Sequence, residues 1–267
     1  MITSTANVKI KNIMKYAKSA KERRRADIFL VEGGRMFSEI PVGLSMETYV
    51  TESFYERNRS LFDSVDYELV AEHVMNALTD TQTPQGVVSV VKRFHYEEEL
   101  VCGLGSDKKP PHQPLIIALE NLQDPGNLGT IIRTAEGAGV TGVVMSRGTV
   151  DIYNPKVVRS TMGSIFRVPF CYVDNFVEWM EGMNCRGFAT YGAHLQGTSF
   201  YDGNYTKPTV FVVGNEGNGL TIEALKTVNQ KIKIPMMGKV ESLNAATATT
   251  VLMYEAMRQR NSGSRQN

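Results

Sequence analysis

The stretch that decides the fold is PLIIALENLQDPGNLGTIIRTAEGAG, residues 114–139. It starts with a continuous apolar run, passes through a polar loop with a Pro-Gly turn, and goes on with the spacing of a helix. A strand that is apolar on both faces and leads into a helix is typical of a parallel sheet covered by helices. We therefore expect an α/β domain whose ligand site lies where this strand ends.

The rest of the chain repeats this alternation of strands and helices, which predicts two α/β domains. The segment GLGSDKKPPHQP (103–114) is rich in Gly and Pro and separates them. We place a smaller domain with a largely parallel sheet at 1–105, a linker at 106–113, and a larger, mainly parallel domain with helices on both faces at 114–267. Further strands of the larger domain are expected at 142–146, 168–173, 187–193, 209–214 and 231–235, and a long last helix from about Leu243 to Arg260.

Composition excludes several classes of protein. No apolar run approaches the ~20 residues that span a membrane, and the N-terminus has no pattern of a secretory signal. The cysteines and histidines are scattered, so we expect neither a disulfide framework nor a metal site. These features predict a cytoplasmic protein in a reducing compartment.

Charge is distributed unevenly. Residues 1–25 hold eight Lys and Arg against a single acid, Glu22, so this arm carries +7 while the whole chain carries +1. A cationic arm on an acidic body is a footprint for a polyanion such as RNA, and a solvated Lys-rich helix face explains the same charges equally well. The side chains expected to contact RNA phosphates are Lys11, Lys15, Arg23, Arg24 and Arg25.

The first of three loops that follow strands in the larger domain is DPGNLG (124–129). A Pro-Gly turn at the start of a helix suits a phosphate, but the lysine of a nucleotide-binding P-loop is absent and Arg133 stands in the helix instead. Asn127 is a natural N-cap for that helix. The neighbours of Arg133 in the helix are apolar, and a buried guanidinium needs an anion or several hydrogen-bond acceptors. We therefore expect Arg133 to bind a ligand phosphate or to form an internal salt bridge.

The second loop, GNEGNGL (214–220), and the third, PMMGKVESLNAATATT (235–250), are rich in small residues. Glycines let the second loop turn sharply and approach a ligand, although an ordinary turn explains them too. The second loop lacks the dinucleotide fingerprint G-x-G-x-x-G. In the third loop Ser242 or Asn244 can cap the last helix, and the alanines and threonines allow close packing at a ligand or at a tight interface.

In their order and wording the three loops resemble the motifs of the SpoU (TrmH-type) RNA ribose 2′-O-methyltransferases of the SPOUT superfamily. The matching segments are NLQDPGNLGTIIRTAEGAG (121–139), FVVGNEGNGL (211–220) and IPMMGKVESLNAATATTVLMYEAMRQR (234–260), which span the larger domain. The smaller domain is similar, more loosely, to the RNA substrate-binding domain of that family in residues 10–40 and 79–91.

The resemblance implies S-adenosylmethionine as the methyl donor, an RNA ribose 2′-hydroxyl as the acceptor, a deep trefoil knot in the larger domain and a homodimer. It places the cofactor against the backbone of Gly214, Ile234, Met236 and Leu243 and requires no metal. Ribosomal RNA is the expected substrate, because the additional N-terminal domain resembles those of rRNA-directed members, and transfer RNA is the alternative. The apolar face of the last helix is a candidate dimer contact, and core packing explains that face equally well.

The resemblance also assigns catalytic positions to Arg133, Asn127, Glu216, Ser242 and Asn244. Arg133 matches the family's arginine that acts on the phosphate and hydroxyl of the target nucleotide. An arginine with a pKa above ~12 is a poor base, so we expect it to grip the phosphate beside the attacking ribose through a bidentate contact. The other four are expected to orient Arg133, the ribose and the cofactor, with Glu216 paired to Arg133.

Three other functions have less support. A non-catalytic RNA-binding protein of this fold is disfavoured because the polar motif positions are intact. A base-methylating SPOUT enzyme is disfavoured because the DPGN…RTA and SLNAA wording belongs to the ribose group. A nucleotide-dependent enzyme lacks a lysine or Mg²⁺ ligand beside residues 214–219.

Overall fold

The computed structural model describes residues 1–79, 81, 83–105 and 112–263. The chain forms two compact units: Met1–Phe94 with Asp151–Phe166, and His95–Val150 with Arg167–Asn267. Within the described ranges, no helix is both long enough and apolar enough to cross a membrane.

The two compact units do not follow a single cut in the chain. The segment Asp151–Phe166, which the sequence assigns to the larger domain, belongs to the first unit. Residues 106–111 of the expected linker 106–113 lie outside the described residues. The domain boundaries at 1–105 and 114–267 therefore stay a prediction.

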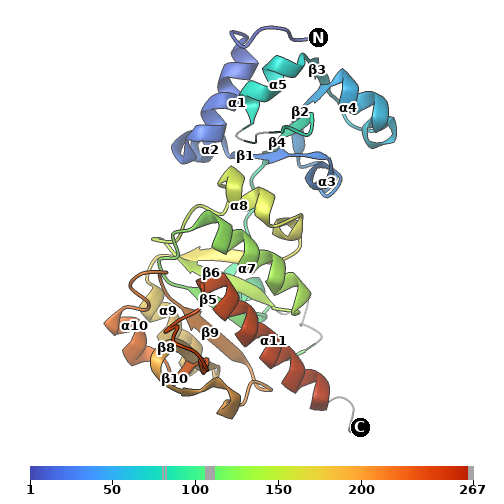
Figure 1. The fold of residues 1–267 in the computed structure, drawn as a ribbon. Helices are drawn as coiled ribbons and strands as arrows, with labels where there is room; N and C mark the ends of the chain where they lie inside the picture. Colours follow the sequence, from blue (N-terminus) through green and yellow to red (C-terminus); the bar gives the residue numbers. More distant parts are fainter. Residues whose placement is uncertain (80, 82, 106–111, 264–267) are drawn as a thin grey trace. The chain divides into compact units, whose positions relative to one another are not determined.

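The first unit is built on a four-stranded sheet (Figure 1). Its strands follow the order β1 (Ile28–Glu32), β4 (Val87–Lys92), β2 (Ser45–Thr51) and β3 (Glu68–Val70). β4 runs antiparallel to both of its neighbours, and only β2 and β3 are parallel. The prediction of a largely parallel sheet is wrong here, because alternation of helices and strands does not fix the direction in which β4 enters between β1 and β2.

The helices of the first unit are short, and the cationic arm forms the first two. Ile10 and Ile13 of the arm are buried, whereas Lys11 and Lys15 are exposed, as the helical spacing predicts. The Asn7 side chain caps the first helix by accepting a hydrogen bond from the Lys9 N–H. The helices are α1 (Val8–Lys18), α2 (Ala20–Ala26), α3 (Gly34–Phe37), α4 (Glu52–Arg57), η1 (Arg59–Phe62), α5 (Glu72–Leu78), α8 (Pro155–Ser160) and η2 (Ser164–Phe166).

The segment Asp151–Phe166 completes the core of the first unit. The ring of Phe29 on β1 packs against Tyr153 at a centroid distance of 4.8 Å and against Phe166 at 6.1 Å. The Tyr153 hydroxyl donates a hydrogen bond to the carbonyl of Phe94. This unit therefore depends on residues that are remote in the sequence.

The second unit contains a six-stranded sheet in which every pair of neighbouring strands is parallel. Every residue of the strands that begin at Leu115, Gly142 and Thr209 is buried, because helices cover both faces. The prediction of a mainly parallel α/β domain is confirmed. In spatial order the strands are β10 (Gln230–Lys233), β8 (Ala189–Ser199), β9 (Thr209–Val213), β5 (Leu115–Leu119), β6 (Gly142–Ser146) and β7 (Phe170–Val173).

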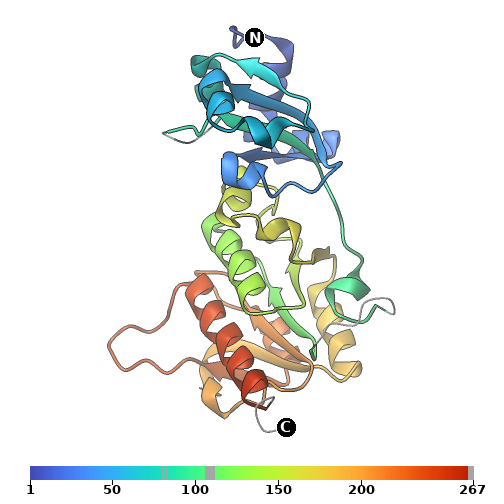
Figure 2. The same ribbon diagram turned by 90° about the vertical axis from the view of Figure 1, so that its right-hand side faces the viewer.

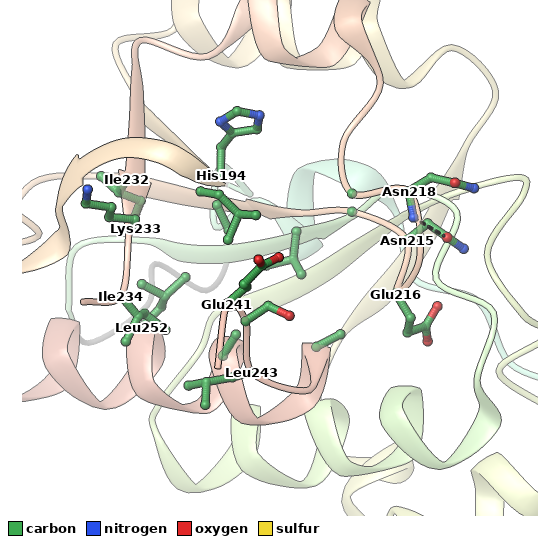
Figure 3. A pocket seen from close by; sticks show the side chains of 18 of the residues that line it. His194, Asn215, Glu216, Asn218, Ile232, Lys233, Ile234, Glu241, Leu243 and Leu252 are labelled. Atoms are coloured by element: carbon green, nitrogen blue, oxygen red, sulfur yellow. Dashed lines mark hydrogen bonds between the residues drawn. The ribbon is translucent and has the colours of Figure 1, made fainter. Parts of the chain in front are cut away.

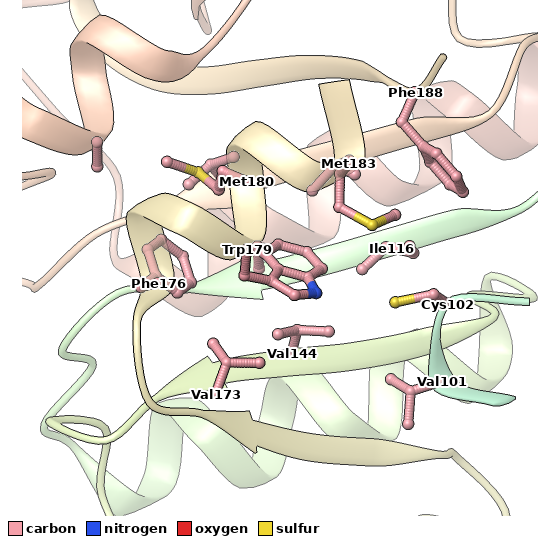
Figure 4. Close-up of a cluster of buried hydrophobic side chains, with 14 of the residues drawn as sticks. Val101, Cys102, Ile116, Val144, Val173, Phe176, Trp179, Met180, Met183 and Phe188 are labelled. Atoms are coloured by element: carbon pink, nitrogen blue, oxygen red, sulfur yellow. The ribbon is translucent and has the colours of Figure 1, made fainter. Parts of the chain in front are cut away.

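Helices α7 (Pro125–Gly137) and α11 (Ala245–Gly263) pack against each other on one face of this sheet (Figures 1 and 2). The other face carries α6 (Glu98–Val101), α9 (Phe176–Cys185) and α10 (Ile222–Thr227). Figure 4 shows the apolar core on this second face, where Trp179 lies between α9 and the strands. The short helix η3 (Phe200–Asp202) follows β8. The trefoil knot stays a prediction.

Candidate active site

Three loops meet beside the carboxyl ends of parallel strands in the second unit. They follow β5, β9 and β10, and they are the loops that the sequence singles out. β5 and β9 are direct neighbours, with Leu119 opposite Val213 in register. The first and second loops therefore leave the sheet side by side, as expected for a ligand site of an open α/β sheet.

The first loop passes into α7 through Asp124, whose carboxylate accepts a hydrogen bond from the Asn127 N–H at 2.8 Å. Pro125 occupies the first turn, where a missing N–H does no harm. The N-cap of α7 is therefore Asp124, and the prediction of Asn127 as the cap is wrong. Because the earlier Asp124 caps the helix, the Asn127 side chain is free to bind the other loops.

A hydrogen-bonded network joins the three loops. The Glu216 carboxylate of the second loop accepts from the Asn127 amide at 3.0 Å and from the backbone N–H groups of Asp124 at 2.9 Å and Gln123 at 3.1 Å. The side-chain oxygen Oδ1 of Asn127 accepts a hydrogen bond from the side-chain amide of Asn244 in the third loop at 2.9 Å. Asn127 thus bridges two loops that lie 89 and 117 residues further along the chain.

The orientation of both amides in this network is fixed by their partners. A carboxylate only accepts, so the Asn127 NH₂ group must face Glu216. Asn244 accepts with its oxygen from the Ala246 N–H at 2.9 Å and thereby caps α11. The prediction that Ser242 or Asn244 caps the last helix is thus met by Asn244, and the helix starts at Ala245 rather than at about Leu243.

Partial burial on its own raises the pKa of Glu216. The hydrogen bonds from the Asn127 amide and from the backbone N–H groups of Asp124 and Gln123 outweigh burial and lower the pKa below its ordinary value of 4.5. Glu216 is therefore a carboxylate at neutral pH. It serves as a fixed acceptor rather than as a proton donor.

Arg133 is not part of this network. Its side chain is exposed, and among the described residues it forms no ion pair and no hydrogen bond. Both the internal salt bridge and the pairing with Glu216 that the sequence suggested are absent from the described contacts. Helix positions six residues apart point about 120° away from each other, so Arg133 does not share the helix face of Asn127. Its guanidinium is available to an external anion.

A cavity of about 320 Å³ lies between the second and third loops (Figure 3). All four residues predicted to bind the cofactor line it, and so do Glu216 and Ser242. Alanines at the start of α11 form part of the wall, so the small residues of the third loop make room for the cavity. The predicted cofactor residues in the lining are Gly214, Ile234, Met236 and Leu243.

Only glycine fits at position 214 in the cavity wall, because the backbone of Gly219 lies directly against it. A Cβ atom at this position would lie 2.1 Å from the Gly219 backbone, a distance that no side chain tolerates. The second loop therefore folds back on itself, with Asn215 and Gly219 joined by backbone hydrogen bonds of 2.9 and 3.0 Å. This turn leaves the backbone exposed to a ligand from one side.

Sequence reasoning missed three charged or titratable residues of this cavity: His194, Lys233 and Glu241. His194 lies in the middle of β8 and Lys233 is the last residue of β10, and neither stands in a motif that marks a ligand site. Glu241 lies inside the third motif, beside Ser242, and this position was the only available signal. No cluster of His, Cys, Asp or Glu that could hold a metal ion occurs among the described residues.

The predicted RNA-contact residues differ in exposure. Lys11, Lys15, Arg24 and Arg25 are exposed. Arg23 is only 3% exposed, and its guanidinium donates to the Asp151 carboxylate at 2.7 Å and to the Tyr16 carbonyl at 2.8 Å. Because this guanidinium is buried and hydrogen-bonded within the first unit, the prediction that Arg23 contacts an RNA phosphate is wrong.

Comparison with known protein families assigns the chain to one of them. The model of the SpoU rRNA Methylase family matches residues 114–254, which is more than half of the chain. The chain belongs to this family. The model of the MRM3-like substrate binding domain matches residues 7–89 of the same SpoU methylase.

Relatives of this SpoU methylase align over nearly its whole length. The 23S rRNA (guanosine(2553)-2'-O)-methyltransferase RlmP of Bacillus subtilis is 32% identical over 95% of this chain and 97% of its own. The 23S rRNA (uridine(2479)-2'-O)-methyltransferase of Streptomyces viridochromogenes is 32% identical over 91% of this chain and 86% of its own. The crystal structure of the AdoMet bound rRNA methyltransferase from Sinorhizobium meliloti superposes with a TM-score of 0.82 at 28% identity, covering 96% of this chain and 97% of that one.

Proposed function

We propose that this SpoU methylase transfers a methyl group from S-adenosylmethionine to a ribose 2′-hydroxyl of ribosomal RNA. One observation carries the proposal. The cavity between the second and third loops adjoins a hydrogen-bonded network of Asn127, Glu216 and Asn244, which holds all three loops together. Two relatives named as 23S rRNA 2′-O-methyltransferases support the substrate class.

The cavity fits the cofactor in size and chemistry. Its volume of about 320 Å³ lies in the range of small-molecule sites. The backbone of Gly214 and Met236 can bind an adenine edge and a ribose, while Ile234 and Leu243 supply apolar walls. When bound, S-adenosylmethionine supplies a methyl group on a positively charged sulfur. The residues of the chain then have to hold that methyl in line with the ribose oxygen.

We assign the acceptor side to Arg133 and to the polar network. Arg133 grips the phosphate beside the target ribose, because an exposed, unpaired guanidinium matches a phosphate in a bidentate manner. Asn127, Glu216 and Asn244 hold the loops that position the ribose against the cavity, and Ser242 contributes a hydroxyl at the cavity wall. The ribose proton leaves to the phosphate or to a water, since Arg133 is too weak a base to take it.

A homodimer is part of the proposal. Leu252, Met253 and Ala256 of α11 are buried within one chain, so core packing accounts for this half of the apolar face. Tyr254 is 44% exposed, and Val251 and Met257 are half-buried on the outer side of the same helix. We propose that this outer side meets a second copy and lets Arg133 serve the cavity of that copy.

The function is tested by incubating the protein with labelled S-adenosylmethionine and either 23S rRNA or bulk tRNA from cells that lack the gene. Methyl incorporation at a ribose 2′-oxygen of 23S rRNA is the expected result. Incorporation into tRNA alone would support the transfer-RNA alternative, and RNA binding without incorporation would support a non-catalytic role. A cytoplasmic location stays a prediction.

A further inference from the structure

The proposed function leaves two charged side chains of the cavity without a task, Lys233 and Glu241, and the carboxylate of Glu241 is the one that suits a cationic ligand. Glu241 lines the cavity, and Figure 3 shows its side chain directed into the space between the loops. Within the part of the chain that the structure describes, this carboxylate accepts no hydrogen bond and forms no ion pair. The Glu241 side chain is exposed, so its carboxylate is accessible to a bound group of opposite sign.

The other titratable groups of the cavity leave an excess of negative charge. Glu216 is ionised, but its oxygens are already occupied by Asn127 and two backbone N–H groups. Lys233 adds one positive charge at the end of β10, and the His194 Nδ1 accepts from the Gln196 N–H at 3.2 Å. Two carboxylates against one ammonium fit a ligand with a net positive charge.

We propose that Glu241 contacts the sulfonium of S-adenosylmethionine and makes the cavity prefer the methyl donor to its demethylated product. The proposal rests on the proposed function. Methyl transfer breaks the S–CH₃ bond, leaves the electron pair on sulfur as a neutral thioether, forms an O–CH₃ bond and releases the hydroxyl proton. The attraction of Glu241 therefore exists before the reaction and disappears after it, which favours release of the product.

The position of Glu241 in the third loop agrees with this role. It precedes Ser242 directly and lies three residues before Asn244, which joins the acceptor network. Glu241 therefore belongs to the same loop as the residue that joins the acceptor network. A ligand that fills the cavity beside the apolar walls of Ile234 and Leu243 would displace water and so reduce the screening of this charge.

The test is a calorimetric titration of the full-length protein with S-adenosylmethionine and, separately, with S-adenosylhomocysteine. We compare the wild type with Glu241→Gln, with Glu241→Asp, and with Glu223→Gln, an exposed glutamate on α10 outside the cavity. Glu241→Gln is expected to weaken binding of the donor about tenfold, or ~1.4 kcal/mol, and to change binding of the product less than about twofold. Glu241→Asp is expected to restore part of the donor affinity, and Glu223→Gln to change neither.

Each outcome separates the inference from the proposed function. Equal weakening of donor and product would show that Glu241 binds the amino group that both share, and this result overturns the inference. Unchanged affinities for both ligands overturn it as well. If the wild type itself binds neither ligand, the proposed function fails and the inference fails with it.

Discussion

At the scale of single residues, the site depends on Glu216 as a fixed acceptor of several hydrogen bonds. Glu216→Gln replaces one carboxylate oxygen by an NH₂ group, which then faces the N–H of Gln123 or Asp124. We expect turnover to fall about 10- to 100-fold, the value of one charge-assisted hydrogen bond. Steady-state methylation measures this loss. Glu223→Gln is the matched control, and full activity in Glu216→Gln would refute the role.

The lowered pKa of Glu216 also predicts how stability depends on pH. Its folded-state pKa lies below the ordinary 4.5, so its contribution is fully present above 4.5 and is lost as pH falls through the folded-state value. The difference in free energy of unfolding between wild type and Glu216→Gln should stay constant from neutral pH down to about 4.5. Below pH 4.5 this difference should shrink. Denaturant unfolding at several pH values measures it. A difference that grows on acidification would contradict the hydrogen-bond scheme.

At the scale of elements, the segment Asp151–Phe166 is a structural part of the first unit, and Arg23 is its test. Arg23→Ala leaves the Asp151 carboxylate without its partner and should cost about 3 kcal/mol of stability, as expected for a broken buried pair. Arg24→Ala, one residue further along an exposed face, should cost less than about 0.5 kcal/mol. Thermal and denaturant unfolding compare the two variants. Equal stabilities would show that Arg23 is not held as described.

Sequence patterns predicted the elements better than their contacts. The apolar runs around Leu115 and Thr209 located a parallel sheet because burial on both faces leaves a mark in composition. Strand direction in the first unit leaves no such mark, so the antiparallel entry of β4 was missed. The partner of Arg23 was invisible for a related reason, since Asp151 lies 128 residues away.

The site was predicted to a similar extent. The motifs brought Asn127, Glu216 and Asn244 together correctly, although the pairing of Glu216 with Arg133 was wrong because Asn127 and two backbone N–H groups occupy the carboxylate. The cap of α7 was assigned to Asn127 because both Asp and Asn suit that position and the pattern does not rank them. His194 belongs to the cavity only through the fold.

At the scale of the whole molecule, RNA binding should depend on the exposed half of the cationic arm. Replacing Arg24 and Arg25 by Ala removes two phosphate contacts and should reduce the salt slope of RNA affinity by about 0.7 to 0.9 per contact. Filter binding or fluorescence anisotropy over a range of salt concentrations measures the slope. Lys226→Ala, an exposed cation on α10, is the control. An unchanged slope in the arm variant would place the RNA elsewhere.

The proposed dimer predicts that sites are shared between subunits. If Arg133 of one copy serves the cavity of the other, Arg133→Ala and Asn127→Ala are each inactive alone but complement each other when mixed as subunits. Random exchange gives about one quarter of wild-type activity, because half of the dimers then hold one intact site. Methylation assays on mixed and unmixed samples measure this. No recovery after verified subunit exchange would mean that Arg133 acts within its own chain.

The central claim is that this chain methylates a ribose 2′-hydroxyl of ribosomal RNA through the site around Asn127. The most direct measurement maps 2′-O-methylated positions in the 23S rRNA of cells that lack the gene, complemented with the wild type or with Asn127→Ala. We predict one position that is methylated with the wild type, unmethylated without the gene, and nearly unmethylated with Asn127→Ala. An identical methylation map in all three strains would contradict the account.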